Sequence, residues 1–456
     1  MYAQESTFID GKIIGSKGGN ILLRYYTNTT TLEEANITVE VNAIGEFRAE
    51  ILIEDPQIVT LQYQKVPIPI YLEPHKNLGL VFEDHNRASS IRYLEKNGQN
   101  NNEVLDAFDN RFGYRNEKNV YSNLVQLPVK LYQALKFANN VDRFFLLEKR
   151  HAEEIQFFES AIEQKPNLST NFIESMRTEI KYRHLAYLKN YVDSDDLPQV
   201  SQKQYYNLFP DSVYSDTKAL RTLAYQMFLG AYSKCACEEK LDKALAYYTD
   251  YKVYYNCIKT DEQLSEASKE YVLGRLIYLN IKPEKAIPIK PLFEDFKMYS
   301  KDRILSSEIE ARYRLASSLS SGTTAPNFEL EQKNGEMITL SELKGKKVYI
   351  SFWASWCGPC KAEILASKDN RAKLKNEDIK FVYININDEK ETWQNHSITK
   401  KVGGIHLWTG SQKNEVLKTF GIVTIPKRFL LNESGQFISP FPASDSDGFV
   451  NFVKEN

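Results

Sequence analysis

Cysteine is scarce in this sequence, since 456 residues contain only five. A small disulfide-stapled scaffold would contain far more, so stability must come from packed hydrophobic cores and each cysteine needs its own explanation. The chain also has little net charge, because 58 Lys and Arg residues face 60 Asp and Glu residues, a formal charge of −2. Without a net basic field to hold a polyanion, nucleic acid is not expected as a partner.

Long hydrophobic runs are also absent. No apolar stretch approaches the roughly 20 residues that cross a bilayer, so no transmembrane helix is expected. The start, MYAQESTFIDGK, has no basic region followed by an apolar one, yet it resembles the flank that remains after a signal peptide is removed. It predicts an exported protein in the periplasm or cell envelope, with a lipid anchor as an open possibility and a cytosolic protein as the alternative.

Residues 1–85 have the pattern of β-structure. Short runs such as NITVEV and EFRAEILI alternate apolar and polar residues, and turn residues such as Gly45 separate them. Because successive side chains of a strand point to opposite faces, each run can bury one face and expose the other. The pattern predicts an N-terminal all-β domain, built as an antiparallel sandwich.

Residues 86–316 change to a helical period. Apolar residues recur on one stripe, as at Phe172, Met176 and Ile180, and charged residues lie between them. This pattern predicts an all-α middle domain of several helices. A Ser, Gly and Thr run that ends in proline, residues 317–326, predicts a linker before a last domain.

Residues 327–456 alternate strand and helix patterns, which predicts a layered α/β domain around a central sheet. The strand pattern KVYISFW leads directly into Cys-Gly-Pro-Cys, so Cys357 is expected at the first turn of a helix. Unpaired backbone N–H groups and the positive end of the helix dipole stabilise a thiolate at such a place.

Two cysteines three residues apart suit thiol-disulfide exchange. That reaction needs one ionised, exposed sulfur and a second sulfur that can attack the mixed disulfide it forms. The spacing on a helix predicts Cys357 as the attacking thiol and Cys360 as the resolving thiol. Gly358 allows a partner chain to approach closely, and Pro359 fits the first helical turn, so both are predicted to border the bound partner.

Two other uses of the cysteine pair fit less well. Structural zinc needs four ligands, and no second Cys-x-x-Cys or histidine pair lies nearby, since His396 and His406 are isolated. A peroxide-reducing cysteine would have Thr or Ser three residues ahead and a proline further back, where Ala354 and Ile350 stand. The expectation is therefore a redox-active dithiol with no metal and no added cofactor.

The segment FWASWCGPC resembles the active-site segment of thioredoxin. Over residues 322–456 the chain resembles the TlpA-type thiol-disulfide oxidoreductases, which implies a thioredoxin-like fold. The β pattern ahead resembles the N-terminal domain of exported Bacteroidetes proteins of this type. The resemblance implies that Ile425 precedes a cis proline, Pro426, which guides the partner polypeptide near Trp356. It also implies that the carboxylate of Glu363 handles the proton released on exchange.

The sequence departs from these families at two places, and two basic residues follow Pro426. Ser351 stands where thioredoxin has a buried aspartate, which leaves Glu363 as the candidate for proton transfer. Leu365 replaces a helix-kinking proline, which predicts a straighter helix. Lys427 and Arg428 add positive charge beside the cleft, where they either favour acidic partners or form a solvated rim.

The other three cysteines, Cys235, Cys237 and Cys257, lie in the predicted helical domain. Because positions i and i+2 point to different faces of a helix, Cys235 and Cys237 would chelate a metal poorly. Buried single thiols are the expectation, with a bridge from Cys257 across a helical hairpin as the alternative.

The sequence thus predicts a multidomain oxidoreductase that exchanges disulfides with another protein. The reductase direction is favoured over the oxidase direction because the Gly-Pro pair and the Ile-Pro pair resemble those of reducing thioredoxins. A membrane electron donor and a homodimer through the N-terminal or helical domain are further expectations. The alternative is a partner-binding scaffold or redox sensor without turnover.

Overall fold

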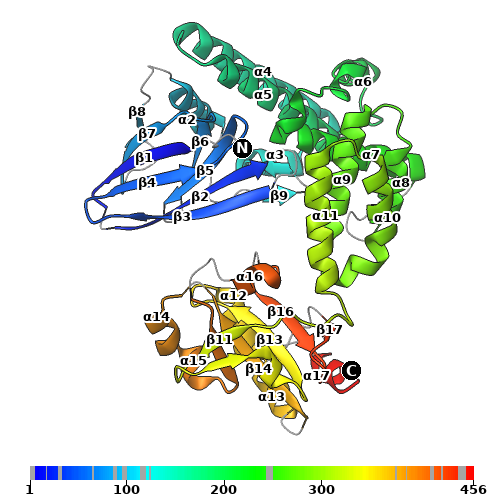
Figure 1. Ribbon diagram of the computed structural model, residues 1–456. Helices are drawn as coiled ribbons and strands as arrows, with labels where there is room; N and C mark the ends of the chain where they lie inside the picture. The colour runs from blue at the N-terminus through cyan, green and yellow to red at the C-terminus, as the bar shows by residue number, and fades with distance from the viewer. Residues whose placement is uncertain are drawn as a thin grey trace. The chain divides into compact units, whose positions relative to one another are not determined.

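A computed structural model gives the architecture of the chain (Figure 1). It describes residues 6–16, 18–28, 33–63, 66–85, 90–94, 100–112, 120–122, 125–242, 250–374, 377–386, 388–410, 415–422, 425–439 and 448–455. The amino-terminal residues 1–5, on which the export expectation rests, lie outside this set. Contacts group the chain into two compact units, a first unit of residues 1–275 and a second unit of residues 276–456.

The first unit begins with two four-stranded sheets, ordered β4-β1-β7-β8 and β3-β2-β5-β6. Their side chains share one buried apolar cluster, which contains Ile9 of the first sheet and Leu61 of the second. The strands are β1 (Thr7–Ile14), β2 (Gly19–Asn28), β3 (Glu33–Val41), β4 (Glu46–Ile51), β5 (Gln57–Tyr63), β6 (Val66–Leu72), β7 (Leu78–Glu83) and β8 (Arg92–Leu94).

The alternation in the sequence explains why these segments form strands. In β5 every second residue is buried, and β4 alternates exposed and buried residues along its whole length. Gly45 between β3 and β4 has a φ of +81°, a left-handed conformation that a residue with a Cβ adopts at a cost. The prediction of N-terminal β-structure is therefore confirmed, whereas the sandwich packing stays a prediction.

Two details of the prediction are wrong. The strands are not all antiparallel, because β1 pairs in parallel with β7. A parallel pair needs a long crossover, and the strands of the other sheet lie between β1 and β7 in the chain. The predicted all-α region also contains β8, β9 (Val120–Ser122) and β10 (Val125–Leu127). Three residues are too few for an alternating pattern to be read in the sequence.

Helices make up most of the rest of the first unit, as the period of 3.6 predicted. They are α2 (Asn101–Phe112), α3 (Val129–Phe137), α4 (Asn140–Gln164), α5 (Thr170–Tyr191), α6 (Gln199–Asn207), α7 (Leu223–Leu241) and α8 (Tyr251–Lys259), with short 3₁₀ turns η1 (Asp211–Val213) and η2 (Ala219–Arg221). Phe172, Met176 and Ile180 of α5 are buried together. The Ser169 hydroxyl caps α5 by accepting a hydrogen bond from the N–H of Phe172.

The expectation of single buried thiols in this region is wrong for two of the three cysteines. A disulfide joins Cys237 on α7 to Cys257 on α8, while Cys235 is a free thiol that donates to the carbonyl of Lys189. The Cα atoms of the bridged pair are 5.9 Å apart, which lies in the usual range. Sequence alone could not reveal this pairing, because it depends on how α8 packs against α7.

We predict that this disulfide stabilises the first unit. Replacing both partners, Cys237→Ser with Cys257→Ser, opens a loop with a sequence separation of 20. The free energy of unfolding should fall by about 3 kcal/mol, since the unfolded chain regains entropy. The matched control Cys235→Ser keeps a hydroxyl donor and should change stability by less than about 1 kcal/mol. Equal denaturant midpoints for the double variant and the Cys235→Ser control would contradict the prediction.

The second unit contains helices followed by a mixed sheet. Helix α9 (Glu266–Asn280) spans the boundary, and η3 (Pro283–Lys285), α10 (Ala286–Tyr299) and α11 (Arg303–Ser318) follow. The remaining elements are β11 (Glu329–Gln332), β12 (Met337–Thr339), η4 (Leu340–Leu343), β13 (Lys347–Trp353), α12 (Gly358–Ala366), α13 (Lys368–Lys373), β14 (Ile379–Asn385), α14 (Lys390–Asn395), α15 (Ser397–Lys401), β15 (Ile405–Trp408), α16 (Glu415–Thr419), β16 (Lys427–Leu431), β17 (Phe437–Ser439) and α17 (Phe449–Glu455).

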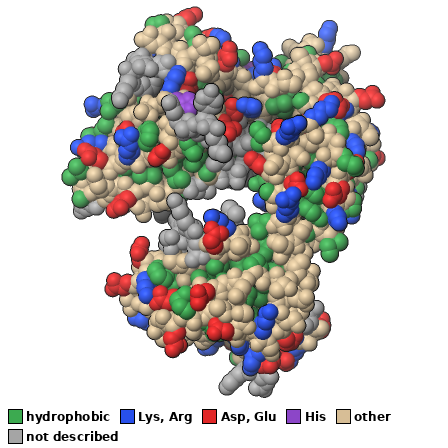
Figure 2. Space-filling model, viewed as in Figure 1, with side chains coloured by type: hydrophobic (Ala, Val, Ile, Leu, Met, Phe, Trp, Pro, Cys, Tyr) green, Lys and Arg blue, Asp and Glu red, His purple; other side chains and the backbone are tan. Residues whose placement is uncertain are grey.

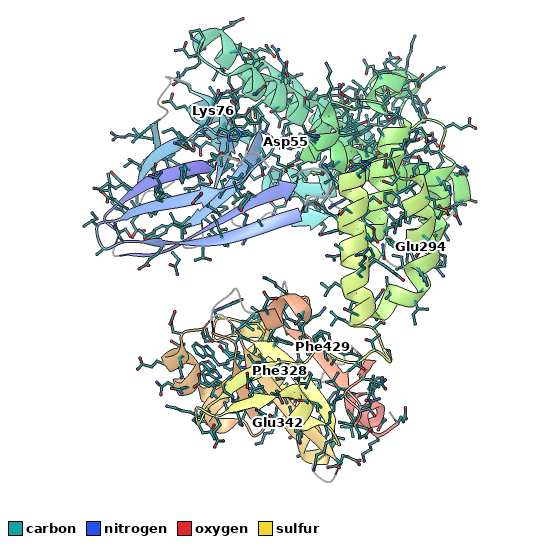
Figure 3. The ribbon with its side chains drawn as sticks, viewed as in Figure 1. Asp55, Lys76, Glu294, Phe328, Glu342 and Phe429 are labelled. Carbon is teal, nitrogen blue, oxygen red and sulfur yellow. A yellow bond between two sulfur atoms is a disulfide. The ribbon has the colours of Figure 1, made fainter. Side chains whose placement is uncertain are left out.

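The seven strands of this sheet are ordered β12-β11-β15-β14-β13-β16-β17. The central strands β13, β14 and β15 are parallel, and β16 is antiparallel to β13. Six of the seven residues of β13 are buried, because the sheet is covered on both faces. Buried aromatic rings such as Phe328 and Phe429, labelled in Figure 3, fill one face. This is the thioredoxin-like α/β domain that the sequence predicted.

The predicted linker, residues 317–326, is held against this sheet. Leu319 is part of the buried cluster, the N–H of Gly322 donates to the carbonyl of Phe437, and the N–H of Ala325 donates to that of Gly435. The helical segment 276–319 therefore leads into the sheet through a hydrogen-bonded connection. The exact domain boundaries stay predictions.

Surface charge in the structure matches the balanced composition. On the face shown in Figure 2, basic and acidic side chains are interspersed over both units. Among the described residues, none of the helices combines the length and the apolarity that a membrane span requires.

Candidate redox site

The two cysteines of the Cys-Gly-Pro-Cys segment lie where β13 leads into α12. Cys357 is the N-cap residue of α12 and is bonded to Cys360 by a disulfide, with 5.4 Å between the Cα atoms. The N–H of Cys360 points to the sulfur of Cys357 at 3.2 Å. A helix start thus supplies an N–H donor and the positive end of its dipole to this sulfur, as the sequence predicted.

The surface next to the disulfide is open although the sulfurs are buried. Cys357 is 4% exposed, whereas its neighbour Trp356 is 63% exposed. Gly358 and Pro359 are exposed as well, and a Cβ added at Gly358 would meet no atom within 4 Å. An incoming chain could therefore lie against these three residues and contact the sulfur of Cys357.

Sheet register brings the predicted proline to the same edge. Because β16 is antiparallel to β13, its first residue, Lys427, is paired with Phe352 near the end of β13. The peptide bond between Ile425 and Pro426, immediately before β16, is cis, so the predicted isomer is confirmed. Pro426 and the start of α12 therefore lie at the same edge of the sheet.

An aspartate that sequence reasoning missed anchors the segment before Cys357. Asp388 follows β14, whose carboxyl end lies beside that of β13, and it is buried. Its carboxylate accepts from the N–H of Ser355 at 2.7 Å, the hydroxyl of Ser355 at 2.6 Å and the amide of Asn385 at 2.6 Å. Lys361 on α12 donates to the carbonyl of Ser355 at 2.6 Å. Asp388 and Lys361 thus hold the backbone at Ser355, two residues before Cys357, through hydrogen bonds from two different elements.

We predict that Asp388→Ala lowers both stability and thiol reactivity. Three donors would lose a charged acceptor, which should cost about 3 kcal/mol of unfolding free energy. Looser placement of Cys357 should slow its reaction with a neutral small disulfide roughly tenfold at a temperature where the variant is folded. The neighbouring exposed residue gives the control Glu389→Gln, which should match the unaltered protein in both measurements. A normal rate in a destabilised Asp388→Ala protein would show that the anchor does not position the sulfur.

Glu363 lies on α12, one turn after Cys360, and is buried. Its carboxylate accepts from the guanidinium of Arg428 at 2.6 Å and from the hydroxyl of Tyr349 at 3.2 Å. Glu363 is therefore not a solvated side chain on the helix surface. Arg428 on β16 is paired in register with Ser351, the position where thioredoxin has an aspartate, so the ion pair occupies that part of the sheet.

Of the two alternatives for Lys427 and Arg428, the solvated rim is wrong. The side chain of Arg428 is 21% exposed and ion-paired with Glu363. Lys427 is half-buried, and burial lowers its pKa to about 8, with Glu284 opposing that shift and the nearby cations adding to it. Sequence could suggest positive charge at this edge, and successive residues of a strand point to opposite faces, but only the fold shows that Arg428 is the one that pairs with Glu363.

We predict that the ion pair between Glu363 and Arg428 contributes to stability. Arg428→Gln leaves the buried carboxylate of Glu363 without its guanidinium partner, and the unfolding free energy should fall by about 3 kcal/mol. Arg428→Lys keeps the charge and should recover part of that loss. The exposed pair of Lys418 and Glu415 offers a control, because Lys418→Gln should cost less than about 1 kcal/mol. Similar losses of unfolding free energy in the Arg428→Gln and Lys418→Gln variants would contradict the prediction that the buried ion pair contributes more than the exposed one.

The expectation of a straighter helix after Cys360 is wrong. α12 ends at Ala366 and α13 begins at Lys368, so Ser367 interrupts the helix without a proline. The hydroxyl of Ser367 donates to the carbonyl of Ile364 at 2.8 Å, and the Arg371 guanidinium donates to the same carbonyl at 2.7 Å. These side chains satisfy a carbonyl that a continuous helix would bond, and a polar side chain inserted in this way breaks a helix.

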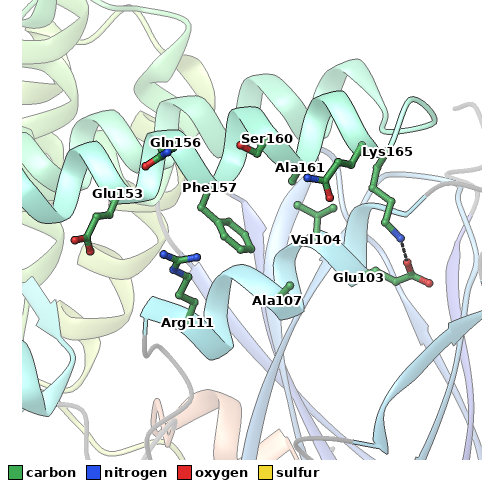
Figure 4. Close-up of a pocket in the computed structure, with 11 residues that line it drawn as sticks. Glu103, Val104, Ala107, Arg111, Glu153, Gln156, Phe157, Ser160, Ala161 and Lys165 are labelled. Carbon is green, nitrogen blue, oxygen red and sulfur yellow. Dashed lines mark hydrogen bonds and ion pairs between the residues drawn. The ribbon is translucent and has the colours of Figure 1, made fainter.

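A groove of about 570 Å³ in the first unit contains none of the predicted site residues (Figure 4). It lies between α2 and α4, with an ion pair of Glu103 and Lys165 at one side and Arg111 stacked over the ring of Phe157. The described residues also contain no group of three or more His, Cys, Asp or Glu side chains that could hold a metal ion.

Comparison with known proteins gives relatives for this part of the chain. The family model described as Redoxin matches residues 320–448. The chain is 31% identical over 134 residues to the thiol-disulfide oxidoreductase ResA of Bacillus subtilis, a match that covers 29% of this chain and 74% of that protein. It is 30% identical over 117 residues to ResA of Halalkalibacterium halodurans, covering 26% of this chain and 65% of the relative.

A solved structure also matches. The thioredoxin domain of a thiol-disulfide oxidoreductase from Bacteroides vulgatus is 23% identical, with a TM-score of 0.28, and the match covers 30% of this chain and 98% of that one. Residues 1–319 lie outside the Redoxin match. The TlpA subtype stays a prediction.

Proposed function

Because this chain belongs, through its C-terminal part, to the ResA family of thiol-disulfide oxidoreductases, we propose that it reduces disulfides in exported proteins. The observation that carries the proposal is the disulfide of Cys357 and Cys360 at the start of α12, beside an exposed surface. The family relation supports exchange of thiols and disulfides, and the direction of electron flow is part of the proposal.

Exchange would proceed in two attacks. In the dithiol form, the thiolate of Cys357 attacks one sulfur of the partner's disulfide, and the other partner sulfur leaves as a thiolate that takes up a proton. The thiolate of Cys360 then attacks Cys357, which releases the second partner sulfur and leaves the disulfide of the structure. Two electrons pass to the partner, which ends as a dithiol.

Glu363 is proposed to accept the proton that Cys360 loses. It lies three residues from Cys360 on the same helix, and both side chains are buried. A buried thiol needs a nearby base when it becomes the nucleophile, and a positioned carboxylate can act in this way. Arg428 and Tyr349 hold the carboxylate in place, so they are positioning residues in this proposal.

Partner binding is proposed along Trp356, Gly358, Pro359, Ile425 and Pro426. The first three are the exposed residues around the disulfide, and the last two form the cis peptide at the same edge. A backbone laid across this edge could place its disulfide against Cys357. No metal or added cofactor is needed for the two attacks.

Location in an oxidising compartment is supported by the second disulfide. The bridge of Cys237 and Cys257 lies outside the redox site, and such disulfides persist mainly in secreted and periplasmic proteins. A reductase there needs a supply of electrons, which we propose comes from a membrane electron donor. The lipid anchor and the homodimer stay predictions.

The test is a trapping experiment with the full chain. Cys360→Ser removes the resolving sulfur, so covalent adducts of Cys357 with partner proteins should accumulate in the periplasm and disappear on treatment with dithiothreitol. Cys357→Ser should give no adducts and should abolish the reduction of insulin. A Cys360→Ser protein that forms no adduct, together with an unaltered protein that fails to reduce insulin, would exclude the proposed reaction.

A further inference from the structure

Helix α12, which starts at the redox site, has an exposed face without charge. Its buried residues are Cys360, Glu363 and Ile364, whose spacing places them on one face of the helix. Cys360 and Ile364 belong to the same buried apolar cluster as Phe352 of β13, so this face is turned toward the sheet. On the other face, four exposed residues form what we call the apolar stripe: Pro359, Ala362, Leu365 and Ala366.

The two charged side chains of α12 are directed away from the stripe. Glu363 is buried and ion-paired with Arg428 on β16. The ammonium of Lys361 donates to the carbonyl of Ser355, on the segment that precedes the helix, at 2.6 Å. The stripe therefore offers only apolar side chains to the solvent.

Such a face is unusual for a helix at a protein surface, which normally has charged or polar residues on the side turned away from the core. Other helices of this domain follow the usual pattern, since α13, α16 and α17 have exposed charged residues such as Lys368, Glu415 and Lys454. On α12 the corresponding surface contains Leu365, which is 58% exposed. Single exposed apolar residues are common, but a row of them beside an exposed tryptophan is typical of an interaction site.

The stripe is continuous with the proposed partner surface. Pro359 belongs to both, and Trp356, which is 63% exposed, stands directly before Cys357. Leu365 follows Cys357 by eight residues, which along a helix axis is about 12 Å. An extended chain advances about 3.3 Å per residue, so a polypeptide whose cysteine contacts Cys357 could reach Leu365 with a residue about four positions away. The stripe thus lies within reach of the substrate chain itself.

The size of the stripe favours a short polypeptide segment over a second copy of this chain. A stable dimer interface uses roughly 20–30 residues from each partner. The stripe and Trp356 together offer five residues, and the exposed charged residues Lys368 and Asp369 follow soon after it. Apolar side chains suit this surface better than charged ones, because no charge on the stripe would offset the desolvation of a charged group.

We propose that the apolar stripe binds apolar side chains of the polypeptide whose disulfide is reduced. This inference rests on the proposed function and adds a substrate preference to it. Polypeptides with apolar residues about three to five positions from the attacked cysteine react fastest. Leu365, the largest side chain of the stripe, determines this preference. The two attacks at the sulfurs are the same for every substrate.

Two synthetic peptides of equal length and equal charge test the preference. Each has one internal disulfide, with leucines in one peptide and serines in the other at the third to fifth positions on either side of it. The reduced full-length protein is mixed with each peptide, and the second-order rate constant is measured by stopped-flow. The leucine peptide should react roughly tenfold faster, because partial burial of its side chains stabilises the complex. Added salt should not reduce this ratio, because the contact involves no charge.

Variants of Leu365 assign the preference to the stripe. Leu365→Gln removes the largest apolar side chain and should lower the ratio between the two peptide rates roughly threefold to tenfold. Leu365→Met keeps an apolar side chain of similar volume and should keep most of the ratio. Each rate is divided by the rate with 2-hydroxyethyl disulfide, measured on the same variant, so that a change in thiol reactivity cancels.

Met337→Gln is the matched control. Met337 is 53% exposed on β12, an edge strand that three other strands separate from β13. Since neighbouring strands lie about 4.8 Å apart, this residue is about 19 Å from the strand that leads into α12. The variant removes an exposed apolar side chain elsewhere on the same domain and should leave the ratio between the peptides unchanged.

The outcomes distinguish this inference from the function on which it rests. Equal rates for the two peptides, or a Leu365→Gln protein with the ratio of the unaltered protein, would overturn the substrate preference while the exchange reaction stands. A protein that sediments as a dimer and becomes monomeric on Leu365→Gln would also overturn it, because a second copy would then cover the stripe. A reduced protein that reacts with neither peptide nor 2-hydroxyethyl disulfide would overturn the proposed function, and the preference with it.

Discussion

The redox site depends on the pairing of β13 with β14 on one side and with β16 on the other. The parallel pair places the carboxyl ends of β13 and β14 at one edge, and the antiparallel partner starts at that same edge. Cys357, Asp388 and Pro426 follow or precede those three strand ends, although up to 69 residues separate them in the chain. One set of backbone hydrogen bonds therefore assembles the disulfide, its anchor and the cis peptide.

Buried charge defines the rest of the site. The carboxylates of Asp388 and Glu363 are both taken out of water, and each is surrounded by donors: backbone, hydroxyl and amide groups for Asp388, and guanidinium and phenol groups for Glu363. Moving either carboxylate away from its donors would leave a buried charge unpaired, which costs folding free energy. These hydrogen bonds therefore also restrict how the elements that carry them can move. Exchange thus takes place at a rigid turn, while the flanking surface around Trp356 stays accessible.

The two disulfides suit different roles because their surroundings differ. The bond between Cys357 and Cys360 borders exposed residues at a helix start, where a thiolate is stabilised, so it suits reversible exchange. The bond between Cys237 and Cys257 joins two different helices, α7 and α8, and both residues are buried, so it suits a structural role.

Sequence by itself determined the alternation of the N-terminal strands, the helical period that follows, the redox cysteine pair at a helix start and, through resemblance, the cis proline. These features are local or are carried by short motifs, so neighbouring residues specify them. Tertiary structure alone decided the parallel pairing of β1 with β7, the partner of Cys237, the anchor at Asp388 and the ion pair of Glu363 with Arg428. Each of these joins residues far apart in the chain, and such contacts arise from packing and strand register, which no local pattern encodes.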